Sequence, residues 1–216
     1  MKMNRLQFIT TNAADAEKAC KGGVRWVQLR VKNKPADEWQ AIALETKKVC
    51  AQYGATFIVN DNVEIAKAVD ADGVHLGKED MQPDEARKIL GNNFIIGGTA
   101  NTMDDIRRLN EMNVDYIGLG PFRFTSTKAN LSPVLGINGY AEIILQCAIE
   151  NTQIPVIAIG GIQLTDIEGL LQTGVNGIAV SSAIAGAEDI EVAARNFIEQ
   201  TNANTKNETR FANHSR

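Results

Sequence analysis

The segment QLRVK, residues 28–32, places two cations and an amide at alternate positions of a stretch with the pattern of an extended strand. Alternate side chains of an extended chain point to the same side, so Gln28, Arg30 and Lys32 are expected to face the same way. Two cations and an amide on one side suit a bound anion. An exposed strand edge with solvated charges explains this segment equally well when it is taken alone.

Two aspartates follow later apolar runs, Asp61 in VNDN and Asp80 in HLGKEDM. Taken alone, Asp61 fits the N-cap of the helix pattern that follows it, and Asp80 fits a turn. At the ends of neighbouring strands, however, the two carboxylates would lie together beside Arg30 and Lys32. Magnesium favours a few protein oxygens together with phosphate oxygens of a substrate. The four residues therefore predict one Mg²⁺ ion that also binds a diphosphate.

Paired glycines and paired serines end two further runs. IAIGG ends in Gly160 and Gly161, and GIAVSS ends in Ser181 and Ser182 ahead of a helical pattern. Backbone N–H groups at such turns, and at the start of a helix, can bind a phosphate. Tight turns alone would explain one Gly-Gly pair, but the two loops together predict a second anion site.

All these residues follow short apolar runs that alternate with amphipathic segments. The runs predict strands at residues 6–10, 24–30, 55–60, 73–77, 94–98, 114–120, 155–161 and 177–182. The segments predict helices at residues 13–21, 35–53, 62–69, 83–90, 103–112, 137–149, 164–174 and 186–200. Eight such units favour an α/β fold, a single closed (β/α)8 TIM barrel, over a flavodoxin-like open sheet. The active site of such a barrel lies on the face formed by the loops after the strands.

The length and composition fit one catalytic domain. A chain of 216 residues that is 44% hydrophobic and 22% charged can bury one sizeable core. We expect the barrel to occupy residues 1–200. The remaining segment, 201–216, is polar and rich in Asn and Thr, and it is expected to be a disordered C-terminal tail.

The charge and the apolar patterning exclude several classes of protein. A net charge of −4 argues against a partner such as nucleic acid that requires a basic surface. Neither a membrane-spanning run nor an apolar signal core is visible, so we expect a cytoplasmic protein. Cys20, Cys50 and Cys147 are interpreted as buried, inert thiols, and His75 as a packed core histidine rather than a ligand.

Taken in order, the motifs resemble those of the thiamine-phosphate synthase family over about residues 5–200. They are QLRVK (28–32), ND (60–61), DGVHLGKEDM (72–81), GLGPFRFTSTK (118–128), PVIAIGGI (155–162) and GIAVSSAI (177–184). The resemblance implies a (β/α)8 barrel that joins 4-amino-2-methyl-5-hydroxymethylpyrimidine diphosphate to a methylthiazole ethyl phosphate, simple or carboxylated. The products would be thiamine phosphate and pyrophosphate, formed by a Mg-assisted dissociative substitution. The partners would then be two phosphorylated small molecules, and the oligomeric state stays open, a homo-oligomer included.

The resemblance also implies a role for individual residues. The residues that would bind the pyrimidine diphosphate are Gln28, Arg30, Lys32, Asn60, Thr99 and Lys128. Of these, Arg30, Lys32 and Lys128 would be catalytic. Binding of the thiazole phosphate falls to Thr125, Ser126, Thr127, Gly161, Ser181 and Ser182. Asp61 and Asp80 would hold one Mg²⁺ ion per subunit.

The segment GGTAN departs from the family pattern, because Thr99 and Asn101 stand where the family usually has Ser and His. Thr99 keeps a hydroxyl for the diphosphate, whereas the role of Asn101 is in doubt. A thiazole tautomerase of the same superfamily would carry a histidine in the loop after the sixth strand, where this chain has Pro121. A non-catalytic phosphate-binding barrel is the alternative from another class, and it would not need two carboxylates beside the cations.

Overall fold

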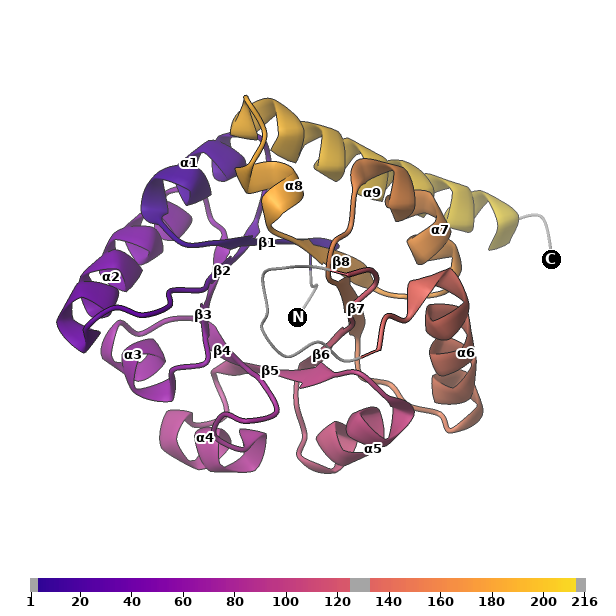
Figure 1. Cartoon of the computed structure of the whole chain (residues 1–216), viewed down its shortest axis with the longest axis horizontal. Helices are drawn as coiled ribbons and strands as arrows, with labels where there is room; N and C mark the ends of the chain where they lie inside the picture. The colour runs from indigo at the N-terminus through magenta and orange to yellow at the C-terminus, as the bar shows by residue number, and fades with distance from the viewer. Residues whose placement is uncertain (1–3, 125–132, 213–216) are drawn as a thin grey trace.

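The protein is a closed barrel of parallel strands surrounded by helices, seen end-on in Figure 1. The computed structural model describes residues 4–124 and 133–212. In this part of the chain eight strands pair in sequence order, and β8 pairs with β1 to close the barrel. The predicted α/β (β/α)8 fold is therefore confirmed.

The strands lie close to the predicted apolar runs. They are β1 (Leu6–Thr10), β2 (Trp26–Leu29), β3 (Thr56–Asn60), β4 (Gly73–Leu76), β5 (Ile95–Ala100), β6 (Tyr116–Leu119), β7 (Val156–Ile159) and β8 (Gly177–Val180). Most of their residues are buried, as expected for parallel strands covered by helices on the outside.

The helices follow the amphipathic segments, with one addition. They are α1 (Ala13–Lys21), α2 (Ala36–Gln52), α3 (Val63–Ala68), α4 (Pro83–Leu90), α5 (Met103–Glu111), α6 (Gly136–Ile149), η1 (Leu164–Asp166), α7 (Ile167–Gln172), α8 (Ser182–Ala185) and α9 (Ile190–Ala212). The short helix α8 directly after β8 was not predicted.

Local capping residues mark the starts of several helices, and at α3 the cap differs from the one expected. Thr102 and Asp105 form a capping box at α5, and Pro83 occupies the first turn of α4. Asp61 was expected to cap α3, but Asn62 does so: its side chain accepts the N–H of Ile65. The interpretation of Asp61 as a cap is therefore wrong, and its carboxylate is available to the barrel mouth.

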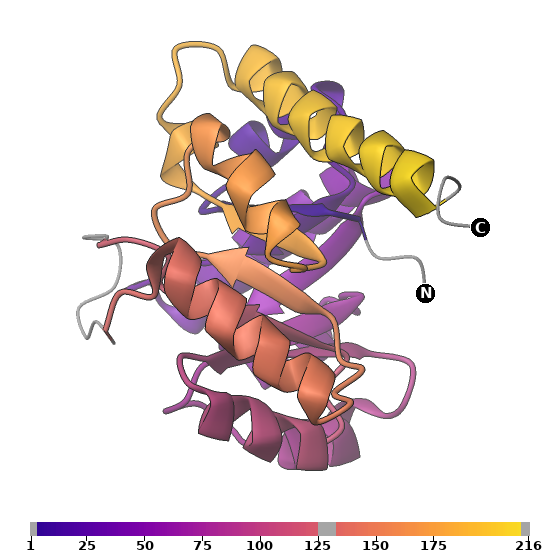
Figure 2. The same cartoon turned by 90° about the vertical axis from the view of Figure 1, so that its right-hand side faces the viewer.

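The last helix extends beyond the predicted domain boundary. Helix α9 runs from Ile190 to Ala212 and packs on α1 and α7 along the outside of the barrel (Figure 2). Thr201 is buried, and its hydroxyl donates to the carbonyl of Phe197. A polar composition predicted a disordered tail from residue 201, whereas the helix continues through most of that segment.

The apolar core lies in two layers. The larger layer fills the space between the strands and the helices, and all three cysteines are buried there. The smaller layer fills the barrel itself and contains Ile9, Trp26, Ile58, Tyr116, Ile157 and Ala179. Above it, the side chains that point inward from the carboxyl ends of the strands are largely polar. None of the helices that the structure describes is long and apolar enough to span a bilayer.

A reciprocal pair of hydrogen bonds fixes the start of three strands, β4, β6 and β8. The residue before β8, Asn176, donates its backbone N–H to Val156 and accepts the N–H of Val156 with its side-chain oxygen at 2.8 Å. Asp72 before β4 and Asp115 before β6 make the same pair with Phe57 and Ile96. Each clamp joins a strand to its predecessor at the amino-terminal end of the barrel.

We predict that Asn176→Ala lowers the free energy of unfolding by about 1–3 kcal/mol, because the N–H of buried Val156 loses its acceptor. Asn176→Asp keeps an oxygen in the same place and should cost clearly less. Urea unfolding followed by circular dichroism measures both changes. Equal losses in the two variants would contradict a role for this hydrogen bond.

Candidate active site

A pocket of about 510 Å³ opens at the carboxyl ends of the strands. All eight strands or the loops after them contribute to its wall, including Ile9 to Thr11 at the end of β1 and Ala179 to Ser182 at β8. The pocket brings together every predicted site residue that lies in the described part of the chain: Gln28, Arg30, Lys32, Asn60, Asp61, Asp80, Thr99, Gly161, Ser181 and Ser182. The predicted residues Thr125, Ser126, Thr127 and Lys128 lie outside the described residues.

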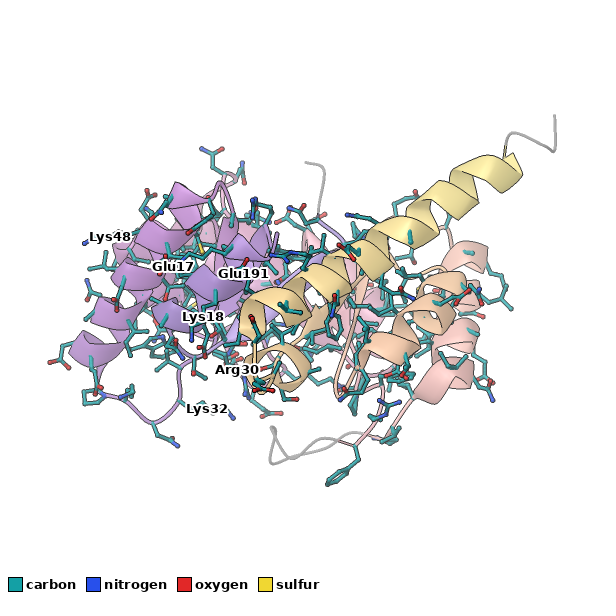
Figure 3. The ribbon with its side chains drawn as sticks, turned by 90° about the horizontal axis from the view of Figure 1, so that it is seen from above. Glu17, Lys18, Arg30, Lys32, Lys48 and Glu191 are labelled. Atoms are coloured by element: carbon teal, nitrogen blue, oxygen red, sulfur yellow. The ribbon has the colours of Figure 1, made fainter. Side chains whose placement is uncertain are left out.

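Two of the cations that line this pocket come from the loop after β2. Arg30 and Lys32 both line the pocket and lie on the same side of the molecule, close to α8, while Lys48 lies away from them on α2 (Figure 3). The backbone N–H of Arg30 donates to the carbonyl of Thr10 at 2.8 Å, which extends the β1–β2 pairing by one residue. The alternation predicted for QLRVK is therefore confirmed: Gln28, Arg30 and Lys32 face one space.

Local backbone geometry and contacts direct the two aspartates towards the pocket. Asp61 adopts a positive φ of 64°, and its N–H donates to the carbonyl of His75 at 2.8 Å. Asp80 folds back so that its Oδ2 accepts the N–H of Gly77 at 2.6 Å. A Cβ at position 77 would stand only 2.8 Å from that oxygen, so glycine gives the Asp80 carboxylate its place.

The two carboxylates interact unfavourably in the metal-free site. Loss of solvation in the pocket and the neighbouring Asp80 raise the pKa of Asp61 to about 6, although Arg30 and Asn60 act in the opposite direction. A divalent cation between the carboxylates would remove this repulsion. The described residues contain no group of three or more His, Cys, Asp or Glu side chains that could hold a metal. Two carboxylates fit Mg²⁺ when a ligand and water supply the remaining oxygens.

Asn60 carries an unsatisfied donor into this site. Its side chain is 5% exposed and lines the pocket. Its Nδ2 lies near enough to the Asp61 carboxylate to act on its pKa, but it makes no hydrogen bond of good geometry among the described residues. Leaving such a buried N–H unpaired costs about 1–3 kcal/mol. A ligand acceptor, such as a phosphate or ring oxygen or nitrogen, would satisfy it.

Packing, as well as the predicted anion site, explains why glycines follow β7. Gly160 and Gly161 adopt φ values of 102° and 68°. A Cβ on Gly160 would lie 2.8 Å from Pro121, and one on Gly161 would lie 2.5 Å from Arg123. These positions therefore require glycine even without a ligand. Ser181 and Ser182 stand at the start of α8, beside the glycines in the pocket wall.

Several wall residues were not predicted. Thr10 ends β1 and Thr11 directly follows it, and inspecting the end of that run would have found them. Lys78 also lines the pocket, but its ammonium pairs with Asp105 at 2.6 Å, a partner on α5 that no local pattern indicates. His75 is buried, as predicted, and also reaches the pocket wall.

Asn101 has a structural contact at the position where the family has histidine. It lines the pocket, and its side-chain amide donates to the carbonyl of Gly120. This bond joins the end of β5 to the end of β6. It gives Asn101 a role that does not depend on a ligand.

Comparisons with known proteins find the same family by sequence and by structure. The family described as thiamine monophosphate synthase matches residues 5–184. The chain is 52% identical to the thiamine-phosphate synthase of Phocaeicola vulgatus, over 87% of this chain and 93% of that protein. It is 49% identical to the thiamine-phosphate synthase of Bacteroides thetaiotaomicron, over 91% and 97%. The solved thiamine phosphate pyrophosphorylase of Pyrococcus furiosus is similar with a TM-score of 0.82 and 34% identity, covering 92% of this chain and 96% of that one.

We predict that Asp61→Asn stabilises the metal-free protein at neutral pH. The folded-state pKa of Asp61, about 6, lies above its ordinary value of 3.8, so the folded protein holds this proton more tightly than the unfolded chain does. That contribution to stability is complete below about pH 4 and is lost as the pH rises through 6. Asparagine cannot ionise, and it tolerates a positive φ.

Thermal unfolding with a metal chelator should therefore give a higher midpoint for Asp61→Asn than for the unchanged protein at about pH 7.5. The difference should shrink at about pH 4.5. A difference that is independent of pH would contradict the raised pKa of Asp61.

Proposed function

The chain belongs to the thiamine monophosphate synthase family, and we propose that it joins 4-amino-2-methyl-5-hydroxymethylpyrimidine diphosphate to 4-methyl-5-(2-phosphoethyl)thiazole or its carboxylated form. The products are thiamine phosphate and pyrophosphate. The observation that carries this proposal is the meeting of Arg30 and Lys32 with Asp61 and Asp80 in one pocket. Pro121 lines the same pocket where a tautomerase would carry a histidine, which favours the synthase reaction.

The pyrimidine diphosphate occupies the half of the pocket formed after β2 to β5. Arg30 and Lys32 pair with diphosphate oxygens, and Lys128 joins them. The unsatisfied amide of Asn60 donates to the same substrate, which offsets the cost of its burial. Gln28 and Thr99 contribute further hydrogen bonds from the barrel interior.

Asp61 and Asp80 hold one Mg²⁺ ion per subunit in this proposal. The repulsion that raises the pKa of Asp61 supports it, because a cation favours the charged form of both side chains. The ion, when bound, neutralises negative charge on the diphosphate.

The thiazole phosphate occupies the half of the pocket after β7 and β8. The backbone around Gly161 and the hydroxyls of Ser181 and Ser182 donate to its phosphate. Thr125, Ser126 and Thr127 complete this phosphate site in the proposal. The ring nitrogen then faces the methylene carbon of the pyrimidine.

The reaction is a substitution at that methylene carbon. The carbon–oxygen bond breaks first, the electron pair leaves with the diphosphate, and the pyrimidine amino group feeds electrons into the remaining cation. The lone pair of the thiazole nitrogen then forms the new carbon–nitrogen bond. Arg30, Lys32 and Lys128 are the catalytic cations, because they stabilise the charge that grows on the leaving group. The thiazole nitrogen carries no proton, so no general base is needed.

We also propose a cytoplasmic location and small-molecule partners only. Two phosphorylated intermediates are the expected ligands, and the net charge of −4 makes nucleic acid an unsuitable partner.

A continuous pyrophosphate-release assay tests the proposed reaction. We expect release only when Mg²⁺, the pyrimidine diphosphate and a thiazole phosphate are all present, with thiamine phosphate as the second product. Running the assay with the simple and the carboxylated thiazole identifies the form that is used. Release without any thiazole, or no release with both substrates, would sink the assignment.

Removal of one charged contact should reduce turnover strongly. Arg30→Ala, Lys128→Ala and Asp80→Asn are each expected to lower kcat about 100- to 1,000-fold without loss of fold. The matched control is Lys48→Ala, because Lys48 is exposed on α2 away from the pocket (Figure 3). Asp80→Asn should also weaken the Mg²⁺-dependent binding of pyrophosphate in calorimetry. Wild-type rates in all three site variants would disprove their assigned roles.

A further inference from the structure

A continuous chain of hydrogen bonds crosses the barrel interior beneath the pocket. Gln28 donates to Gln7 at 3.1 Å, and Gln7 donates to the hydroxyl of Tyr116 at 3.3 Å. That hydroxyl lies 3.0 Å from Nδ1 of His75, and Nε2 of His75 lies 3.0 Å from the hydroxyl of Thr99. Gln28, His75 and Thr99 line the pocket, whereas Gln7 and Tyr116 do not. We call these five residues the interior relay.

Two glycines leave space inside the barrel for the two rings of this relay. A Cβ at Gly97 would stand 2.3 Å from Cζ of Tyr116 and 2.5 Å from Nδ1 of His75. A Cβ at Gly118 would stand 3.0 Å from Cε1 of His75. Glycine at these two inward-facing positions of β5 and β6 therefore admits both rings.

The donors and acceptors give the relay a direction. Burial raises the pKa of Tyr116, so its hydroxyl keeps its proton, while the amides of Gln7 and Gln28 oppose this shift as donors to its oxygen do. The Tyr116 oxygen accepts from the Gln7 amide, and Nδ1 of His75 is the other partner at hydrogen-bond distance that could accept the hydroxyl proton. In this direction His75 would carry its proton on Nε2 and donate to the oxygen of Thr99.

The two ends of the relay consequently differ in polarity. At one end, the Gln28 side chain uses its N–H towards Gln7, so its carbonyl oxygen can accept from a ligand in the pocket. At the other end, the Thr99 oxygen accepts from His75, so its own hydrogen can be donated to a ligand. A ligand with an amino group and an anionic group matches this polarity.

We propose that Gln7, Tyr116 and His75 are positioning residues that hold the Thr99 hydroxyl as a donor and the Gln28 carbonyl as an acceptor for one substrate. This inference rests on the proposed function, in which Gln28 and Thr99 both contact the pyrimidine diphosphate; the polarity of the relay matches its amino group to Gln28 and its diphosphate to Thr99. In the reverse direction the Thr99 hydroxyl would donate to Nε2 of His75, so it could not donate to the diphosphate.

Measuring the tautomer of His75 tests this proposal directly. The chain contains two histidines, so a His214→Gln variant leaves a single imidazole signal. We expect nitrogen-15 NMR at neutral pH to show a neutral ring protonated at Nε2. A ring protonated at Nδ1, or at both nitrogens, would overturn the proposal. This measurement needs no substrate, so it stands even if the proposed reaction fails.

A double-mutant cycle tests the effect on catalysis. Thr99→Val removes the terminal hydroxyl and should lower kcat about 10- to 100-fold, the range of a hydrogen bond to a charged group, whereas Thr99→Ser should retain most activity. Tyr116→Phe removes the hydroxyl that sets the tautomer, and it should lower kcat and increase the Nδ1-protonated fraction of His75. The double variant should be no slower than Thr99→Val, because Tyr116 acts through Thr99.

Tyr140→Phe is the matched control, because it removes another buried tyrosine hydroxyl, one that donates to the carbonyl of Leu119 outside the relay. Its effect should multiply with that of Thr99→Val. Multiplicative effects of Tyr116→Phe and Thr99→Val would overturn the proposal. If Tyr116→Phe does not fold, the tautomer measurement and the Thr99→Val and Thr99→Ser pair decide the question.

Discussion

The register of the closed parallel sheet is the constraint on which the site depends. Each strand pairs with the next, and β8 pairs with β1, so the carboxyl ends of all the strands must surround one opening. Residues as far apart in sequence as Gln28 and Ser181 line one pocket for this reason. The reciprocal clamps formed by Asp72, Asp115 and Asn176 fix that register at the opposite end, away from the chemistry.

The layer beneath the opening contains polar groups that lower the stability of the fold. An apolar layer around Trp26 and Ile157 closes the barrel, and the polar layer above it contains an unpaired amide on Asn60 and a carboxylate pair. Each of these groups is unfavourable in the empty barrel and favourable with a ligand that supplies the missing charge or acceptor. Such local conflicts are expected where a sequence is selected for binding rather than for packing alone.

The sequence predicts the barrel well because strand and helix patterns are local. The alternation of QLRVK, the cap Thr102 and the proline at the start of α4 all act within a few residues. Partners that are distant in sequence were not predicted: Asp115 accepts from Ile96, and Tyr116 contacts His75 across two strands. Asp61 was misread because two adjacent residues can both cap a helix, and only the backbone shows that Asn62 does so. Helix α9 continues past position 200, and its residue Thr201 is buried, which the polar composition of this segment does not indicate.

The two residues at the end of β5 that depart from the family pattern have different physical roles. Thr99 points into the barrel, where its oxygen meets His75, so a hydroxyl at this position serves whether it belongs to Ser or Thr. Asn101 lies two residues later at the rim, and its amide donates to Gly120, the first residue after β6. A histidine ring could also donate a hydrogen bond from this place, so the change to asparagine preserves a tie between two strand ends. Since that tie requires only one donor, the position does not need a titratable group. This agrees with a reaction whose nucleophile has no proton to remove.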